Sequence, residues 1–98
     1  MYDTHDKRRL YWLIDQYLSG ALDEDAFCNE YHVAFVVELD LKVLSELEYT
    51  VFSELSEVSE RFSPFKEDFA LWAGFVTAEQ LREKVAEAKE RLEDQDPR

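Results

Sequence analysis

This sequence predicts an all-α protein: a compact antiparallel four-helix bundle that forms one domain over residues 1–98. The length fits a single domain with one modest core. Only two Gly and two Pro occur, too few for the turns of a sheet protein, and a hydrophobic share of 46% is too high for a disordered chain. Apolar residues recur every three or four positions in four separate segments. Amphipathic helices of that kind bury their stripes by packing against one another.

The first two helices are bounded by residues typical of helix ends. The first ends at Ser19-Gly20, because glycine suits the left-handed residue that follows a helix. The second begins after Asp23, a capping residue, and runs toward Asp40. Their predicted core residues are Leu10, Leu13, Ile14 and Tyr17 in the first helix and Phe27, Tyr31, Ala34 and Phe35 in the second.

Capping boxes mark the starts of the last two helices. Ser45 and Glu48 are spaced so that each side chain can bond the backbone N–H of the other, and Thr77 and Gln80 repeat the arrangement. The third helix is expected to end near 63–64, followed by a short extra helix near 64–73. The predicted buried stripes are Leu47, Val51, Leu55, Val58 and Phe62 in the third helix and Leu81, Val85, Ala88 and Leu92 in the last.

The charge balance favours a basic protein as partner. There are 23 Asp and Glu against 11 Lys and Arg, which gives a formal net charge of -12. Such a surface repels nucleic acid and anionic membranes and raises the rate of association with basic proteins. Many helical proteins are acidic for solubility alone, so charge by itself leaves that alternative open.

Motifs of enzymes and of nucleic-acid-binding proteins are missing from the sequence. It has no Gly-rich phosphate loop, no GxSxG elbow, no HExxH and no basic surface studded with aromatic residues. The first twenty residues contain no apolar run long enough for a signal peptide or a membrane span. We therefore expect a cytoplasmic protein that is not an enzyme and that needs no cofactor.

Cys28 is the one cysteine, so a single chain can form neither a disulfide nor a cysteine-based zinc site. Cys28 and His32 are spaced to share a helix face, which allows a metal site or a nucleophile with its base. A third partner is unassigned, and a buried cysteine beside a histidine is common in ordinary cores. We therefore expect Cys28 and His32 to have only a structural role, and no metal ligand is predicted.

Acids and aromatic residues supply the candidate contact residues. Glu46, Glu57 and Glu60 project away from the stripe of the third helix, and we expect Tyr49, Ser53 and Ser56 to project with them. The last helix interleaves its acids with basic residues, which predicts pairing within that helix; the basic residues are Arg82, Lys84, Lys89 and Arg91.

Two groups of aromatic residues have alternative interpretations. The spacing of Phe65, Phe69 and Trp72 favours closure of the core over a binding pocket. Trp12 points away from the stripe of the first helix, so it is either an interface anchor or a cover for one end of the bundle.

Four stretches then follow one another along nearly the whole chain: 13–20 (LIDQYLSG), Phe27 with Tyr31, 60–64 (ERFSP) and 77–82 (TAEQLR). In this order and spacing they resemble the colicin-D-type immunity family. That family is in turn similar to the immunity proteins of contact-dependent growth inhibition systems. Its members are small helix bundles that bind the C-terminal nuclease domain of a bacterial toxin.

The resemblance implies that acidic side chains occupy the basic cleft in which the toxin holds the phosphates of its tRNA or RNA substrate. In the family, an acid directly before an Arg-Phe pair contacts the toxin's catalytic histidine, and Glu60 holds that position here. A second family acid directly follows the proline, where this chain has Phe65, with Glu67 and Asp68 slightly later. The expected toxin contacts are Glu60, Glu57, Glu67, Asp68, Glu46 and Phe65.

The expected partner is therefore a cognate nuclease toxin domain, held by a monomer in a 1:1 complex without direct contact to nucleic acid or membrane. An acidic helical adaptor or regulator that docks on another basic protein is the alternative. A neighbouring toxin gene with a nuclease domain favours immunity, whereas a neighbouring repressor or phage operon favours the regulator.

Overall fold

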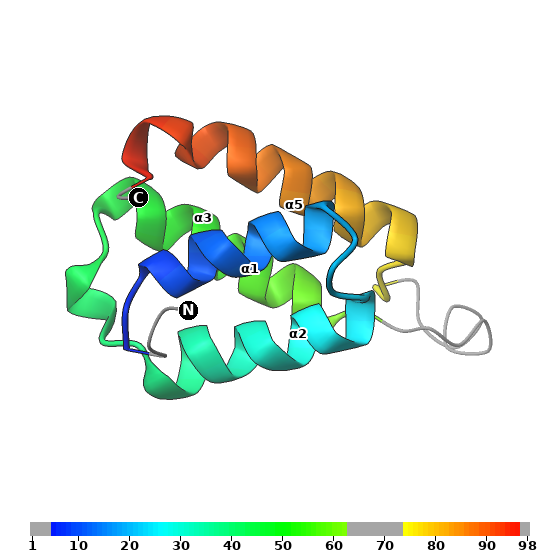
Figure 1. The fold of residues 1–98 in the computed structure, drawn as a ribbon. Helices are drawn as coiled ribbons and strands as arrows, with labels where there is room; N and C mark the ends of the chain where they lie inside the picture. Colours follow the sequence, from blue (N-terminus) through cyan, green and yellow to red (C-terminus); the bar gives the residue numbers. More distant parts are fainter. Residues whose placement is uncertain (1–4, 63–73, 97–98) are drawn as a thin grey trace.

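The computed structural model describes residues 5–62 and 74–96, and within them it is an all-α bundle, as predicted. Consecutive helices run antiparallel, so the chain passes back and forth between two ends of the bundle (Figure 1). The extra helix expected near 64–73 lies outside the described residues. The α-helices are α1 (Arg8–Leu18), α2 (Glu24–His32), α3 (Glu46–Glu60) and α5 (Ala78–Leu92); the shorter elements are the π-helix η1 (Val33–Glu38) and the 3-10 helices η2 (Leu41–Val43) and η3 (Glu93–Gln95).

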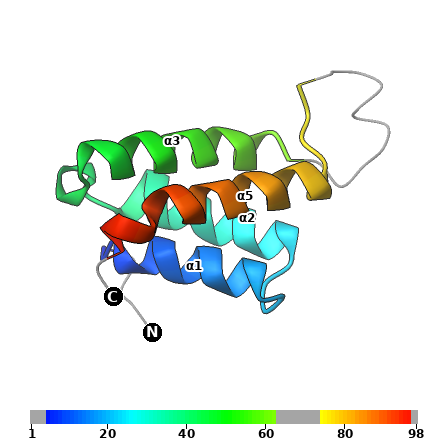
Figure 2. The same cartoon turned by 90° about the horizontal axis from the view of Figure 1, so that it is seen from above.

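The four α-helices surround one core. Helix α1 packs on α2 and α5, and α3 packs on α5 and α2, so that each helix has two neighbours (Figure 2). The stripes predicted for the first, second and last helices are all buried, as predicted. Stacked rings cross the core in chain order through Tyr17, Phe27, Tyr31 and Phe35, with centroids 4.9, 5.5 and 5.7 Å apart. The hydroxyl of Tyr31 donates to the carbonyl of Phe52 at 2.7 Å and joins α2 to α3.

The predicted starts of α2, α3 and α5 are confirmed by their hydrogen bonds, whereas α3 ends at Glu60, before the expected end near 63–64. Both capping boxes form: Ser45 with Glu48 at the start of α3, and Thr77 with Gln80 at the start of α5. The carboxylate of Asp23 accepts a bond from the Ala26 N–H at 2.8 Å. The second predicted helix keeps its length toward Asp40, but it widens after His32 into the π-helix η1.

Gly20 has a φ of +89°, which side chains with a Cβ rarely adopt, and it ends α1 as predicted. We expect Gly20→Ala to lower the free energy of unfolding by about 1 kcal/mol, because alanine is strained in this conformation. Gly20→Asn is the matched control, since asparagine tolerates left-handed backbone and should cost less. Urea unfolding followed by circular dichroism measures both; equal stability of Gly20→Ala and the wild type would contradict the assignment.

The buried face of α3 differs from the predicted one. Leu47 was expected in the core but is 39% exposed, whereas Glu48 is 1% exposed. Ser56, expected to point outward, is buried, while Val58 and Phe62 are half-buried. Phe52 directly follows Val51, so the apolar residues of α3 span a broad face, and the side that packs is turned by about one residue from the predicted stripe. The residues that fill it are Glu48, Val51, Phe52, Leu55, Ser56 and Ser59.

The carboxylate of Glu48 is buried at the junction of α1 and α3. It accepts hydrogen bonds from the ammonium of Lys7 at 3.0 Å, the hydroxyl of Tyr11 at 2.5 Å and the backbone N–H of Ser45 at 2.8 Å. Burial alone raises the pKa of a carboxyl group, but these donors outweigh it, so the pKa of Glu48 lies below its ordinary value. A buried charge is tolerated when it is paired and hydrogen-bonded in this way.

Candidate functional site

Most basic side chains in the described residues are used to join helices. Lys89 of α5 pairs with Asp15 of α1 at 2.8 Å, and Arg91 of α5 pairs with Glu54 of α3 at 2.5 Å. Pairing within the last helix was therefore the wrong prediction for these two residues, because antiparallel neighbours bring acids of other helices closer. The i,i+3 pair of Lys84 with Glu87, at 3.4 Å, does lie within α5. The remaining basic residue, Arg82, donates to the Leu18 carbonyl at 2.7 Å and lies over the Tyr17 ring.

The outer face of α3 carries exposed acids, as predicted. Glu46, Glu57 and Glu60 are all exposed. Glu57 forms an i,i+4 pair with Arg61 at 2.6 Å. Within the described residues, neither Glu46 nor Glu60 has a basic partner. These two carboxylates are therefore available to the basic groups of another protein.

The position of Glu60 is electrostatically unfavourable for the helix that carries it. Glu60 is the last residue of α3, where the helix dipole places partial negative charge and disfavours an acid. Glu46, by contrast, lies in the first turn of α3, where the same dipole stabilises it. Helix stability thus explains Glu46 but gives no reason for an acid at position 60.

Further acids lie at the same end of the bundle as Glu60, at the starts of α5 and α2. The N–H of Val76 donates to the carbonyl of Arg61 at 2.7 Å, which places the end of α3 beside the start of α5 and its Glu79. The start of α2, with Asp23 and Asp25, is at this end as well (Figure 1). The sequence predicts Asp23 only as a helix cap, since these segments are far apart in the chain and their proximity follows from the fold alone.

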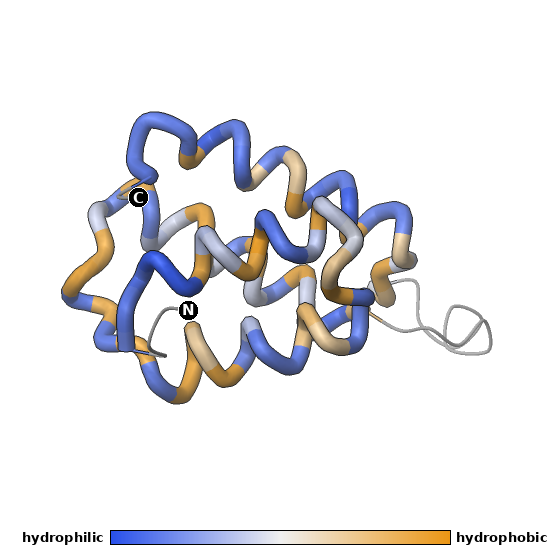
Figure 3. Tube along the Cα trace, viewed as in Figure 1, coloured by the Kyte–Doolittle hydropathy of each residue, from blue (hydrophilic) through white to orange (hydrophobic). Residues whose placement is uncertain are grey.

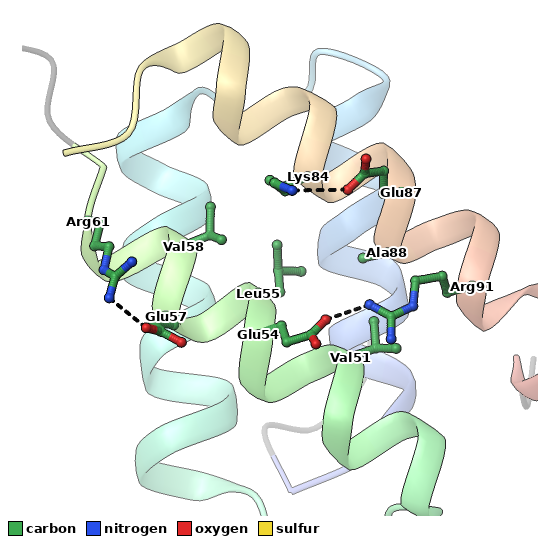
Figure 4. Close-up of a pocket in the computed structure, with 10 residues that line it drawn as sticks. All are labelled: Val51, Glu54, Leu55, Glu57, Val58, Arg61, Lys84, Glu87, Ala88 and Arg91. Atoms are coloured by element: carbon green, nitrogen blue, oxygen red, sulfur yellow. Dashed lines mark hydrogen bonds and ion pairs between the residues drawn. The ribbon is translucent and has the colours of Figure 1, made fainter. Parts of the chain in front are cut away.

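A shallow groove of about 350 Å³ runs between α3 and α5 (Figure 4). Its lining includes Val51, Leu55, Val58 and Ala88 at its floor and three acids facing three basic residues. Those charges form the pairs Glu54–Arg91, Glu57–Arg61 and Lys84–Glu87. Because its charges neutralise one another, the groove is a packing seam rather than the acidic site that was predicted from the sequence.

The remaining predicted site residues fall into two groups. Glu67, Asp68 and Phe65 lie outside the described residues, so their contacts stay predictions. Trp12 is half-buried against the core, with the Arg9 guanidinium 5.7 Å from its ring centroid. This placement favours the alternative in which Trp12 covers the bundle over the one in which it is a fully exposed anchor.

The region of Cys28 and His32 shows no feature of a reactive pair. Cys28 is half-buried and His32 is exposed. Within residues 5–62 and 74–96, no three His, Cys, Asp or Glu side chains come close enough together to hold a metal ion. Burial, with the nearby charges of Asp25 and Glu24, raises the pKa of the Cys28 thiol to about 12.

We expect the Cys28 thiol to react with iodoacetamide at pH 8 about 100-fold more slowly in the folded protein than in the protein unfolded by urea. The reason is that the thiolate, which is the reacting species, is scarce when the pKa of Cys28 is about 12. Mass spectrometry of alkylated protein over time measures the rate. Equal rates in folded and unfolded protein would show that Cys28 is an accessible thiolate.

The described residues form an all-α bundle that carries exposed acids at both ends, including Glu60 at one end and Asp40 at the other. None of the helices described has the length and hydrophobicity needed to cross a membrane. Comparisons with protein-family models, with curated proteins and with solved structures found no match to this chain. The resemblance to colicin-D-type immunity proteins therefore stays a prediction from the sequence.

Proposed function

We propose that this protein is an immunity protein, which binds and neutralises a cognate bacterial nuclease toxin. Its acidic side chains occupy the basic cleft in which the toxin domain holds the phosphates of tRNA or another RNA. The chain is a binding protein and performs no catalysis. Glu60 is the leading contact, with Glu57 and Glu46 on the same outer face of α3.

The main support for this proposal is Glu60, the acid at the end of α3. Glu60 is exposed, has no basic partner within the described residues and is opposed by the helix dipole. Natural sequences accept such local conflicts mainly where function requires them. A basic cleft in the toxin would pair with Glu60, which has no basic partner among the described residues of this protein.

The distribution of basic residues supports the same proposal. Lys7, Arg9, Lys89 and Arg91 are engaged with acids of other segments. The bundle is thus cross-linked by its own basic residues, while a net charge of -12 attracts a basic partner. Long-range attraction of this kind increases the association rate at low salt, and desolvated charge pairs then slow dissociation.

Capture of the partner, followed by an RNA cleavage assay, tests the proposal. The protein is used as bait in a lysate of its native host, the captured partner is identified by mass spectrometry, and RNA cleavage by that partner is measured with and without the protein. We expect a basic nuclease domain whose cleavage stops at one equivalent of added protein. A small acidic helical protein of unrelated sequence serves as the control for charge alone.

The outcomes separate the proposed function from its alternative. A captured regulator without nuclease activity would favour the adaptor function. A nuclease that the control protein inhibits equally would show that bulk charge, rather than a specific surface, accounts for inhibition. Either result would overturn the immunity function.

A further inference from the structure

Exposed hydrophobic side chains gather at the end of the bundle opposite Glu60. Figure 3 shows hydrophobic residues there, where the chain leaves α2 and turns toward α3. Two of them, Val36 and Val37, are 49% and 63% exposed. Grouped exposure of this kind, unlike single exposed residues, marks interaction surfaces. We name the group the valine surface; its members are Val33, Val36 and Val37 of η1 and Leu41 and Val43 of η2.

The valine surface has no evident role in the stability of the bundle. Ala34 and Phe35 already bury the inner side of η1. Valine is a weak helix former because its branched side chain loses rotamer freedom. Exposed valines on a helix therefore do not stabilise the folded protein. Moreover, η1 is a π-helix, and π-helical turns occur frequently at functional sites.

The charges around the valine surface indicate the chemistry of its partner. Glu38, Asp40 and Glu46 flank it in the chain, and the one basic residue among them is Lys42. From the N-terminal segment, His5 lies 3.6 Å from the Glu38 carboxylate, and Lys7, which pairs with Glu48, lies near Val43. A second copy would bring together two chains that each carry a net charge of -12, which opposes self-association. A basic protein surface with an apolar centre matches both the valines and the acids beside them.

The valine surface and Glu60 can belong to one interface. They lie at opposite ends of α3, and Glu46 and Glu60 are separated by about 21 Å along the helix axis. An interface of standard size, about 800 Å² on each partner, is about 30 Å across. The exposed outer face of α3, with Glu46 and Glu57, connects the two ends.

We propose that the valine surface is the apolar anchor of the complex with the basic nuclease domain, while Glu60 supplies the leading charge contact. This inference rests on the proposed function. Desolvated apolar contacts chiefly slow dissociation, whereas exposed charges set the association rate and its salt dependence. The two ends of α3 therefore have separable effects on binding.

The double variant Val36→Thr/Val37→Thr tests the anchor, because threonine keeps the branched shape and replaces a methyl group by a hydroxyl. The probe is the nuclease domain of the toxin encoded beside the gene of this chain. We expect the affinity of the variant to fall about 10-fold or more through faster dissociation, with the salt dependence of association unchanged. Ala86→Ser, at an exposed position of α5, is the control. If the double variant melts early, the more exposed Val37→Thr alone replaces it.

Each outcome decides the inference. Wild-type affinity of the valine variant, when the wild type inhibits the nuclease, would overturn the anchor and leave the proposed function standing. Absence of binding by the wild type would overturn both. A wild-type dimer in analytical ultracentrifugation that becomes a monomer in the valine variant would show that the surface holds a second copy instead. Faster dissociation of an otherwise stable monomer would support the anchor.

Discussion

Glu48→Gln is expected to lower the free energy of unfolding by about 2 kcal/mol, because the buried carboxylate loses the charge that its hydrogen bonds to the half-buried Lys7 and to Tyr11 depend on. The amide would face the Lys7 ammonium with no charge to balance it, and the Tyr11 hydroxyl would lose an ionised acceptor. Urea unfolding at pH 7 measures the effect.

Glu46→Gln is the matched control for that change. Both residues are glutamates in the first turn of α3, so both substitutions remove the same favourable charge from the start of the helix. Glu46 is exposed, however, and its substitution should change stability by less than about 0.5 kcal/mol. Equal effects at both positions would mean that the buried contacts of Glu48 contribute nothing.

The pH dependence of Glu48 has a defined sign. Its pKa is lower in the folded protein than in the unfolded chain, so the folded state binds its proton less readily. Its contribution to stability is fully present above the ordinary glutamate pKa of about 4.3 and is lost as the pH falls through the lower pKa of the folded protein. The difference in stability between wild type and Glu48→Gln should therefore shrink below about pH 4.

Glu60→Lys is expected to weaken binding to the nuclease domain by about 100-fold or more, because it places like charge in a basic cleft. Folding should be unaffected or slightly improved, since lysine suits the negative end of the α3 dipole. Calorimetric titration gives the affinity, and a thermal melt gives the stability.

Glu83→Lys is the control for charge reversal as such, because Glu83 is an exposed acid of α5 rather than of α3. It should reduce affinity far less than Glu60→Lys and only through the change in net charge. Cells that express the toxin should survive with the control variant and die with Glu60→Lys. Full protection by Glu60→Lys would remove Glu60 from the proposed interface.

The sequence by itself determined the fold class and the helix ends. These features depend on residues that are near one another in the chain: a hydroxyl and a carboxylate three positions apart in the capping box of Ser45, or a glycine after α1 at Gly20. The stripe of α5 was predictable for the same reason. Its apolar residues are separated by alanine and charged residues, so the periodicity allows a single inner face.

Tertiary structure alone decided how α3 is turned and where the basic residues find their partners. Because the apolar residues of α3 spread over a broad face that includes both Val51 and Phe52, periodicity could not tell whether Leu47 or Glu48 faces inward. Lys89 and Arg91 reach acids that are distant in the sequence, and no local pattern encodes such proximity. Glu48 combines both levels. Its capping bond to Ser45 follows from spacing, but its burial needed Lys7 and Tyr11, which only the assembled bundle brings within hydrogen-bond distance.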